Sequence, residues 1–390
     1  MIFFTPMHSL GLILQRKRYF APVWVFASLN IMMGTWVLHI PRIKEKLGID
    51  DGELGVALFC YALGILFAIT FASRIIKAIG VGRSTLIGIL SFAVLFLVPV
   101  SVNEYYLLCG SLLITGIASS FTDIAMNALV SDIEVEDEIN FMSAAHGFFS
   151  LGGVIGAGIG SLFIEKIDVS LYHMAGAAVV VVITNLLLAK SYLNIWSPVQ
   201  EGEGKLIFSL FKPLLGLTLI ALIVMGSEGS IEQWSKLYLE DVMEVSREWV
   251  AGLGFVIFSA TMTTGRFFGD AVSSRFGSLR IIIAGCALSF LGYLGILSGM
   301  MILCFVGFGL VGLGFSVVIP ELFRLAGKTK GVSSSEGISF VAGFGFVGFM
   351  AAPASMGFLA DWSSLRLSYT VLAMACAVAF LIGLVLLRKK

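Results

Sequence analysis

A stripe of polar side chains runs through an otherwise apolar stretch at residues 105–131. Its members stand four residues apart, which keeps them near one face of a helix: Thr115, Ser119, Asp123 and Asn127. An ionised acid inside hydrocarbon is costly, so such residues usually face a cavity and have a function. We interpret Ser119, Asp123 and Asn127 as a site that hydrogen-bonds a solute and takes up a proton at Asp123. The alternative is a structural acid bonded to neighbouring helices.

A second acid, Glu228, stands near the outer end of the apolar stretch 207–231. Gly226 and Gly229 flank it, which predicts a broken helix whose exposed backbone lines a cavity. Gln233 and Trp234 follow within two turns, and an amide, a carboxylate and an aromatic face together suit a sugar or another polar ring. In the alternative interpretation Glu228 begins a loop and Trp234 anchors at the membrane interface.

Two further polar residues are candidates in the first half of the chain. Asn30 is the only strongly polar group of the apolar stretch 19–40 and is a candidate for solute binding. His146 lies near the start of the stretch 143–164. Imidazole titrates near neutral pH and could relay protons, although a histidine beside small residues is more often a packing residue.

One basic residue, Arg266, falls inside the apolar stretch 250–270. A cation inside the membrane needs an anionic partner, and we expect Arg266 to pair with Asp270 or Glu321. Functionally this pair would close the cytoplasmic side of a transport path. The same charges also have a purely structural interpretation.

The composition indicates that membrane-spanning helices carry these candidate residues. Hydrophobic residues make up 58% of the 390-residue chain, charged residues 13%, and the mean hydropathy is +0.99, which excludes a soluble globular protein. A membrane-spanning helix needs about 20 apolar residues, and the sequence predicts an all-α membrane protein with twelve of them: 19–40, 53–73, 84–102, 105–131, 143–164, 170–189, 207–231, 250–270, 279–297, 300–326, 337–360 and 368–387.

Several function classes have no support in the sequence. The net charge is zero, which gives no case for nucleic-acid binding. The five cysteines all fall in apolar stretches without metal spacing, so we expect no metal and no cofactor. A phosphate-cradling loop and an acid–base or nucleophile cluster are both lacking, so we expect neither ATP-driven transport nor an enzyme.

The two halves of the chain repeat one another. Gly55, Gly80 and Arg83 recur 197 residues later as Gly252, Gly277 and Arg280, and Gly147 and Gly152 recur 196 residues later as Gly343 and Gly348. We therefore predict a six-helix bundle over 1–190, a cytoplasmic linker over 191–206 and a second six-helix bundle over 207–390. Transporters with a solute site near the bilayer midplane are commonly built from such repeats.

Lysine and arginine are distributed unevenly over alternate loops. One set of loops, which includes both termini, carries seventeen of them and the other set seven. Since basic residues stay on the cytoplasmic side, we expect both termini in the cytoplasm and a multi-pass protein of the bacterial inner membrane.

At this point the chain resembles the major facilitator superfamily. The motif that begins at the end of the eighth span, Gly265 to Asp270 followed by Ser274 to Arg280, is similar to the superfamily's cytoplasmic loop signature. Its first-half copy runs from Arg74 to Arg83, with Lys77 where an acid is usual. The segments Leu47–Gly55, Asp123–Asn127, His146–Gly153, Glu228–Trp234 and Ile319–Gly327 are similar to bacterial permeases near the fucose–proton symporter branch. The resemblance implies a gating role for the charged loop residues Arg74, Lys77, Arg83, Arg266, Asp270, Arg275, Arg280 and Glu321.

These observations favour a secondary transporter, most simply a monomer, that imports a small polar solute such as a sugar together with protons. Asp123, Glu228 and His146 are the candidates for proton coupling. A drug or metabolite exporter of the same superfamily is the first alternative, and a membrane enzyme or a non-transporting sensor is the second. Lipid and a small-molecule solute are the expected partners.

Overall fold

The computed structural model describes residues 11–139, 141–196, 208–329, 332 and 334–388. In these ranges the only regular secondary structure is helical, and twelve helices are long and apolar enough to cross a membrane. The predicted all-α fold with twelve spans is confirmed. Most spans lie within a few residues of their predicted bounds, but the seventh runs to Val242, well beyond the predicted end at residue 231.

The chain divides into two compact units. Unit 1 comprises Met1–Gln200 and Ser246–Val256, and unit 2 comprises Glu201–Val245 and Ile257–Lys390. The first residues of the eighth span therefore group with the N-terminal half of the chain. Most of the predicted linker, from residue 197 on, lies outside the described residues.

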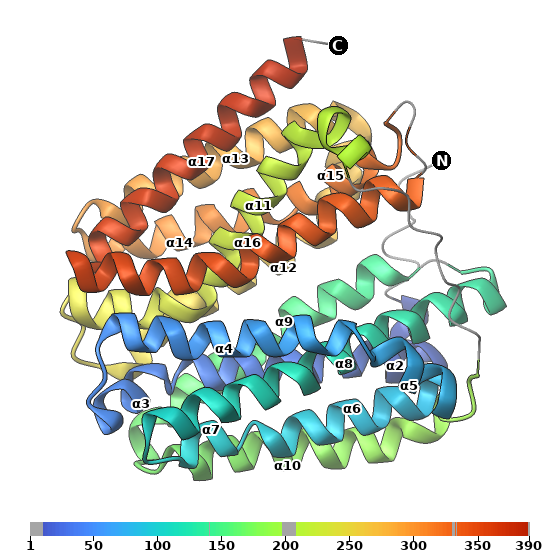
Figure 1. Cartoon of the computed structure of the whole chain (residues 1–390), viewed down its shortest axis with the longest axis horizontal. Coiled ribbons are helices and arrows are strands. Elements are labelled where there is room, and N and C mark those ends of the chain that lie inside the picture. Colours follow the sequence, from blue (N-terminus) through green and yellow to red (C-terminus); the bar gives the residue numbers. More distant parts are fainter. Residues whose placement is uncertain (1–10, 140, 197–207, 330–331, 333, 389–390) are drawn as a thin grey trace. The chain divides into compact units, whose positions relative to one another are not determined.

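Unit 1 is built from long helices joined by short ones (Figure 1). They are α2 (Lys17–Val37), α3 (Ile40–Leu47), α4 (Asp51–Ile69), α5 (Ala72–Ile79), α6 (Val81–Leu95), α7 (Val98–Ser101), α8 (Tyr105–Asp137), α9 (Met142–Phe163), η1 (Ile164–Lys166), α10 (Ser170–Leu188) and η2 (Ala189–Ser191). α2 packs on α9, α8 packs on both α4 and α6, and α10 lies beside α2, α6 and α7.

Unit 2 repeats this arrangement of long helices (Figure 1). They are α11 (Phe208–Leu237), η3 (Tyr238–Val242), α12 (Glu248–Phe276, which begins in unit 1), α13 (Ser278–Leu297), α14 (Met301–Phe315), α15 (Val318–Ala326), α16 (Ser334–Trp362) and α17 (Leu365–Arg388). α11 packs most extensively on α16, and α13 packs on α14 and α17.

The repeat seen in the sequence recurs in the backbone. Gly80 joins α5 to α6 with φ 88° and ψ 150°, and Gly277 joins α12 to α13 with φ 82° and ψ 145°. Side chains other than hydrogen are strained at such positive φ values, which explains why glycine stands at both positions. Two tight turns of one conformation, 197 residues apart, thus start the third and ninth spans.

Glycines also set the closest helix contacts in both units. A Cβ atom on Gly152 of α9 would collide with the Ala27 carbonyl oxygen of α2, and one on Gly348 of α16 would collide with the Leu222 carbonyl oxygen of α11. Small residues let helix backbones approach in this way inside a membrane. The α2–α9 and α11–α16 contacts are therefore equivalent, and both depend on the absence of a side chain.

We predict that Gly152→Ala and Gly348→Ala each lower the melting temperature of the purified protein, because added methyl groups in a filled contact cost about 1–3 kcal/mol. Gly158→Ala and Gly343→Ala are the matched controls. The nearest atom to a Cβ at Gly158 is 3.8 Å away, and nothing lies within 4 Å at Gly343. Thermal unfolding in detergent distinguishes the two pairs; equal losses for all four variants would contradict the repeated contact.

Candidate functional site

The predicted polar stripe of unit 1 lies on α8. Asp123 and Asn127 are half-buried, whereas Thr115 and Ser119 are buried. The Asn127 side-chain amide donates to the backbone carbonyl of Asp123 at 2.9 Å and to its carboxylate Oδ1 at 3.2 Å. The Thr115 hydroxyl donates to the Ser111 carbonyl at 2.7 Å. The accessible polar part of the stripe is thus the Asp123–Asn127 pair.

No basic side chain of the described residues forms an ion pair with Asp123. An amide hydrogen bond only partly replaces the water that a carboxylate loses on burial. The half-buried carboxylate of Asp123 thus has a neutral amide as its side-chain partner among the described residues.

Asn30 and His146 both lie where α2 meets α9. The Asn30 amide donates to the Phe149 carbonyl at 2.9 Å, and its buried Oδ1 has no hydrogen-bond partner among the described residues. Asn30 is only 5% exposed, so it holds the two helices together. His146 is exposed, with its ring 5.3 Å from that of Phe26 in an edge-on contact.

In unit 2, α11 is continuous through Gly226 and Gly229, so the predicted helix break is wrong. The alternative that Glu228 begins a loop is wrong too, because the helix continues to Leu237. A Cβ on Gly226 would lie 3.0 Å from the Gly348 carbonyl oxygen, and one on Gly229 would lie 2.8 Å from the Phe349 oxygen. These glycines serve close packing against α16.

The intramembrane cation Arg266 of α12 pairs with Glu228 of α11. The guanidinium Nη2 lies 3.2 Å from Oε1 of Glu228, and the two side chains are 18% and 20% exposed. Glu228 was not among the predicted partners. Glu321 pairs with Arg324 at 2.9 Å, and the predicted pairing with Asp270 is not tested, because the Asp270 side chain lies outside the described residues.

Glu232 is a candidate that the sequence reasoning missed. It lies one turn beyond Glu228 on the same helix face and is 8% exposed. The buried Lys236 and then Glu240 continue the row at the same interval, with 3.5 Å between their charged atoms. Four-residue spacing identified the stripe on α8 and applies equally to this row. Unit 2 thus holds two carboxylates, Glu228 and Glu232, beside the single guanidinium of Arg266.

Gln233 and Trp234 are both buried in unit 2. The Trp234 ring is fully buried and its Nε1 donates to the Pro353 carbonyl of α16 at 3.0 Å. It is therefore not an anchor at the membrane interface, and in this conformation it offers no face to a solute.

Pro353 of α16 has no backbone N–H, so the Phe349 carbonyl lacks its usual helical hydrogen-bond donor. Gly229 of α11 packs against this same carbonyl.

The remaining predicted gating residues lie at the ends of helices. Arg324 donates to the Ser273 hydroxyl at 2.8 Å while pairing with Glu321, so α15 is tied to α12 there. The others have exposed side chains: Arg74, Lys77, Arg83, Arg275 and Arg280.

A second missed cluster lies at the other end of unit 1, around Arg42 of α3. Its guanidinium lies 2.8 Å from Glu248 in the first turn of α12 and donates to the backbone carbonyls of Ile164 and Ile167 at 2.7 and 2.8 Å. One arginine thus satisfies carbonyls at the end of α9 and η1 and holds the start of α12.

We predict that Arg266→Gln lowers the melting temperature, because it removes the ion-pair partner of Glu228, which lies one turn from the second carboxylate Glu232. The double variant Arg266→Gln with Glu228→Gln should recover part of the loss, and the coupling between the two sites should be about 1–3 kcal/mol. Arg275→Gln is the control, since Arg275 is exposed on the same helix and has no acidic partner among the described residues. Strictly additive losses would show that the pair contributes nothing.

Comparisons with known proteins agree with this architecture. The family model of the Major Facilitator Superfamily matches residues 23–335. An uncharacterised MFS-type transporter of Yersinia pestis is 29% identical over 353 residues, covering 90% of both chains. The quinolone resistance protein NorA of Staphylococcus aureus is 21% identical, with 86% of this chain and 88% of NorA covered.

Among solved structures, the nucleoside transporter NupG has a TM-score of 0.75 at 14% identity, covering 96% of this chain and 100% of that one. This likeness concerns the fold. The family match covers most of the chain. The chain belongs to the major facilitator superfamily and is a multi-pass secondary transporter of small molecules, not an enzyme.

Proposed function

We propose that this protein imports a small polar solute, such as a sugar or a sugar-like metabolite, together with protons. It acts as a monomer in the bacterial inner membrane with both termini in the cytoplasm. The observation that carries the proposal is the set of carboxylates inside the spans: Asp123 of α8 has no ion-pair partner among the described residues, and Glu228 and Glu232 stand one turn apart on α11, where Arg266 pairs with Glu228.

The charge balance supports proton coupling. With both carboxylates of α11 ionised, the three groups Glu228, Glu232 and Arg266 carry one net negative charge, and a single proton makes them neutral. Asp123 likewise becomes neutral with one proton. Because a net charge in hydrocarbon is costly, proton uptake at either site favours the buried arrangement. His146 is the proposed relay, since its exposed ring lies within unit 1.

The solute class follows from the groups that surround these acids. Asp123 and Asn127 present a carboxylate and an amide, as do Glu228 and Gln233, and such groups pair with the hydroxyls of a sugar. Ser119 continues the stripe of Asp123 on α8, and Asn30 of α2 remains a proposed solute contact in a conformation that exposes it. A nucleoside, which is what NupG transports, contains a sugar ring and belongs to the same class of solute.

Closure of the cytoplasmic side is assigned to the charged residues at the helix ends: Arg74, Lys77, Arg83, Arg266, Asp270, Arg275, Arg280 and Glu321. The Glu321–Arg324 pair and its contact with Ser273 support this part of the proposal, because they fix the end of α15 against α12.

Export is the second candidate, and the similarity to NorA favours it. An exporter would exchange protons for an apolar or cationic solute and would not need the amide–carboxylate pairs. A thermal-shift screen of the purified protein against monosaccharides, nucleosides and cationic drugs separates the two. Stabilisation by drugs alone would reject import of a polar solute.

We predict that Asp123→Asn uncouples transport from the proton gradient. Asparagine resembles the protonated acid, so the variant should bind and exchange the solute found in the screen at rates near those of the parent. Uphill accumulation in proteoliposomes driven by an imposed pH gradient should fall at least tenfold. Full gradient-driven accumulation by Asp123→Asn would exclude Asp123 and leave Glu228 and Glu232 as the proton carriers.

The matched control is Asp137→Asn, at the end of the same helix. A bidentate hydrogen bond from Arg18, at 2.7 and 3.0 Å, lowers the pKa of Asp137 below its usual range. Asp137 therefore stays ionised at neutral pH and carries no proton through the cycle, and its variant should keep gradient-driven accumulation.

A further inference from the structure

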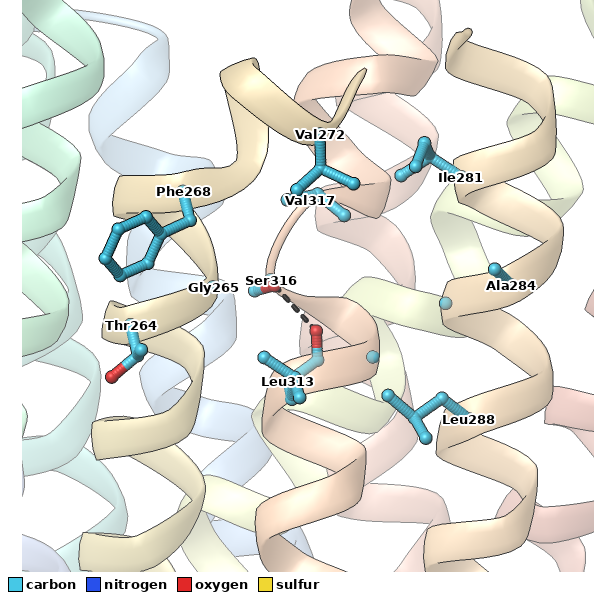
Figure 2. A pocket seen from close by; sticks show the side chains of 12 residues that line it. Thr264, Gly265, Phe268, Val272, Ile281, Ala284, Leu288, Leu313, Ser316 and Val317 are labelled. Carbon is cyan, nitrogen blue, oxygen red and sulfur yellow. Dashed lines mark hydrogen bonds between the residues drawn. The ribbon is translucent and has the colours of Figure 1, made fainter. Parts of the chain in front are cut away.

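Unit 2 carries an open groove whose lining residues are not among the proposed solute, proton or gating residues. α12 and α13 form its two walls, and the end of α14 lies between them (Figure 2). Its volume is about 240 Å³, below the roughly 300–1,000 Å³ of sites that enclose a whole drug-sized ligand. It therefore has room for one narrow chain.

The groove is apolar even at its two hydroxyl groups. The Ser316 hydroxyl donates to the Leu313 carbonyl at 2.6 Å (Figure 2). The Thr264 hydroxyl donates to the Ala260 carbonyl at 2.8 Å. Both hydrogen atoms are thus used within their own segments of chain. A polar solute would find few free hydrogen-bonding groups in this groove, whereas a hydrocarbon chain requires none.

Glycines let both walls of the groove pack closely on the end of α14. A Cβ on Gly265 would collide with the Ser316 hydroxyl, and a Cβ on Gly285 would collide with the Gly314 carbonyl. The walls are nevertheless exposed: Phe268 is 65% and Val272 43% accessible. Exposed apolar walls at membrane depth are suited to contact with lipid.

Two arginines stand at one end of the groove. Arg275 follows the wall residues Phe268 and Val272 on the same face of α12, and Arg280 lies one turn before Ala284 on α13. Gly277 makes the tight turn between the helices. Both arginines are exposed, and neither has an acidic partner among the described residues.

We propose that this groove binds one anionic phospholipid, with an acyl chain between α12 and α13 and the phosphate at Arg275 and Arg280. The apolar lining recognises the chain, and the two guanidinium groups recognise the negative headgroup. The arginines lie on the same helix rows as the wall residues, so one molecule can reach both parts.

The test counts lipids bound to the purified full-length protein by native mass spectrometry, with phosphatidylglycerol and phosphatidylcholine of identical acyl chains at equal concentration. The parent should retain phosphatidylglycerol in preference. Arg275→Gln with Arg280→Gln should weaken phosphatidylglycerol binding by about fivefold for each arginine and leave phosphatidylcholine unchanged. Arg74→Gln with Arg83→Gln, at the corresponding turn of unit 1, is the charge control and should not weaken the tightest binding.

Occupancy of the groove itself is tested by Ala284→Phe, which fills it from an exposed wall position. This variant should lose the tightly bound phosphatidylglycerol, whereas Val306→Phe, at an exposed position of α14 outside the groove, should keep it. Equal binding of the two lipids by the parent would overturn the proposal. So would retention of phosphatidylglycerol by Ala284→Phe, or its displacement by inorganic phosphate.

Discussion

A guanidinium inside hydrocarbon must be neutralised, and the pairing of Arg266 with Glu228 meets that constraint. The pair requires α11 and α12 to lie together at one depth. α11 must then be continuous there, since a break would displace Glu228. At the level of Glu228, Gly226 and Gly229 pack closely on α16, and α11 is continuous through both glycines. The ion pair and the glycine contacts therefore support one another.

The buried carboxylates have different neighbours in the two units. In unit 1, Asp123 has an amide neighbour and no ion-pair partner among the described residues. In unit 2, Arg266 pairs with Glu228, and a second buried carboxylate, Glu232, lies one turn away on the same helix. In the proposed proton coupling, one proton neutralises Asp123 in unit 1 and one neutralises a carboxylate of α11 in unit 2. A proton is the smallest species that can supply a positive charge at such a site and leave again.

Hydropathy and spacing predicted the twelve spans and the repeat because span length and the Gly80 and Gly277 turns depend on local chain properties. The stripe on α8 was visible for the same reason. The predicted helix break at Gly226 and Gly229 was wrong because a glycine in a membrane helix can either interrupt the helix or allow close contact with a neighbouring helix. Only the position of α16 decides between these two outcomes. The partner of Arg266 likewise depends on which helix lies beside α12, and Glu228 is 38 residues away in the sequence. Glu232 was missed although its spacing from Glu228 carried the signal.

Movement of protons with the solute is measured most directly by following the pH outside proteoliposomes that have no imposed gradient. The solute that binds in the screen is added to a weakly buffered suspension, and a membrane-impermeant dye reports the pH. Symport predicts that the outside becomes more alkaline as the solute enters, and that a protonophore abolishes the change. Solute entry without any change in pH, or with acidification of the outside, would contradict proton-coupled import.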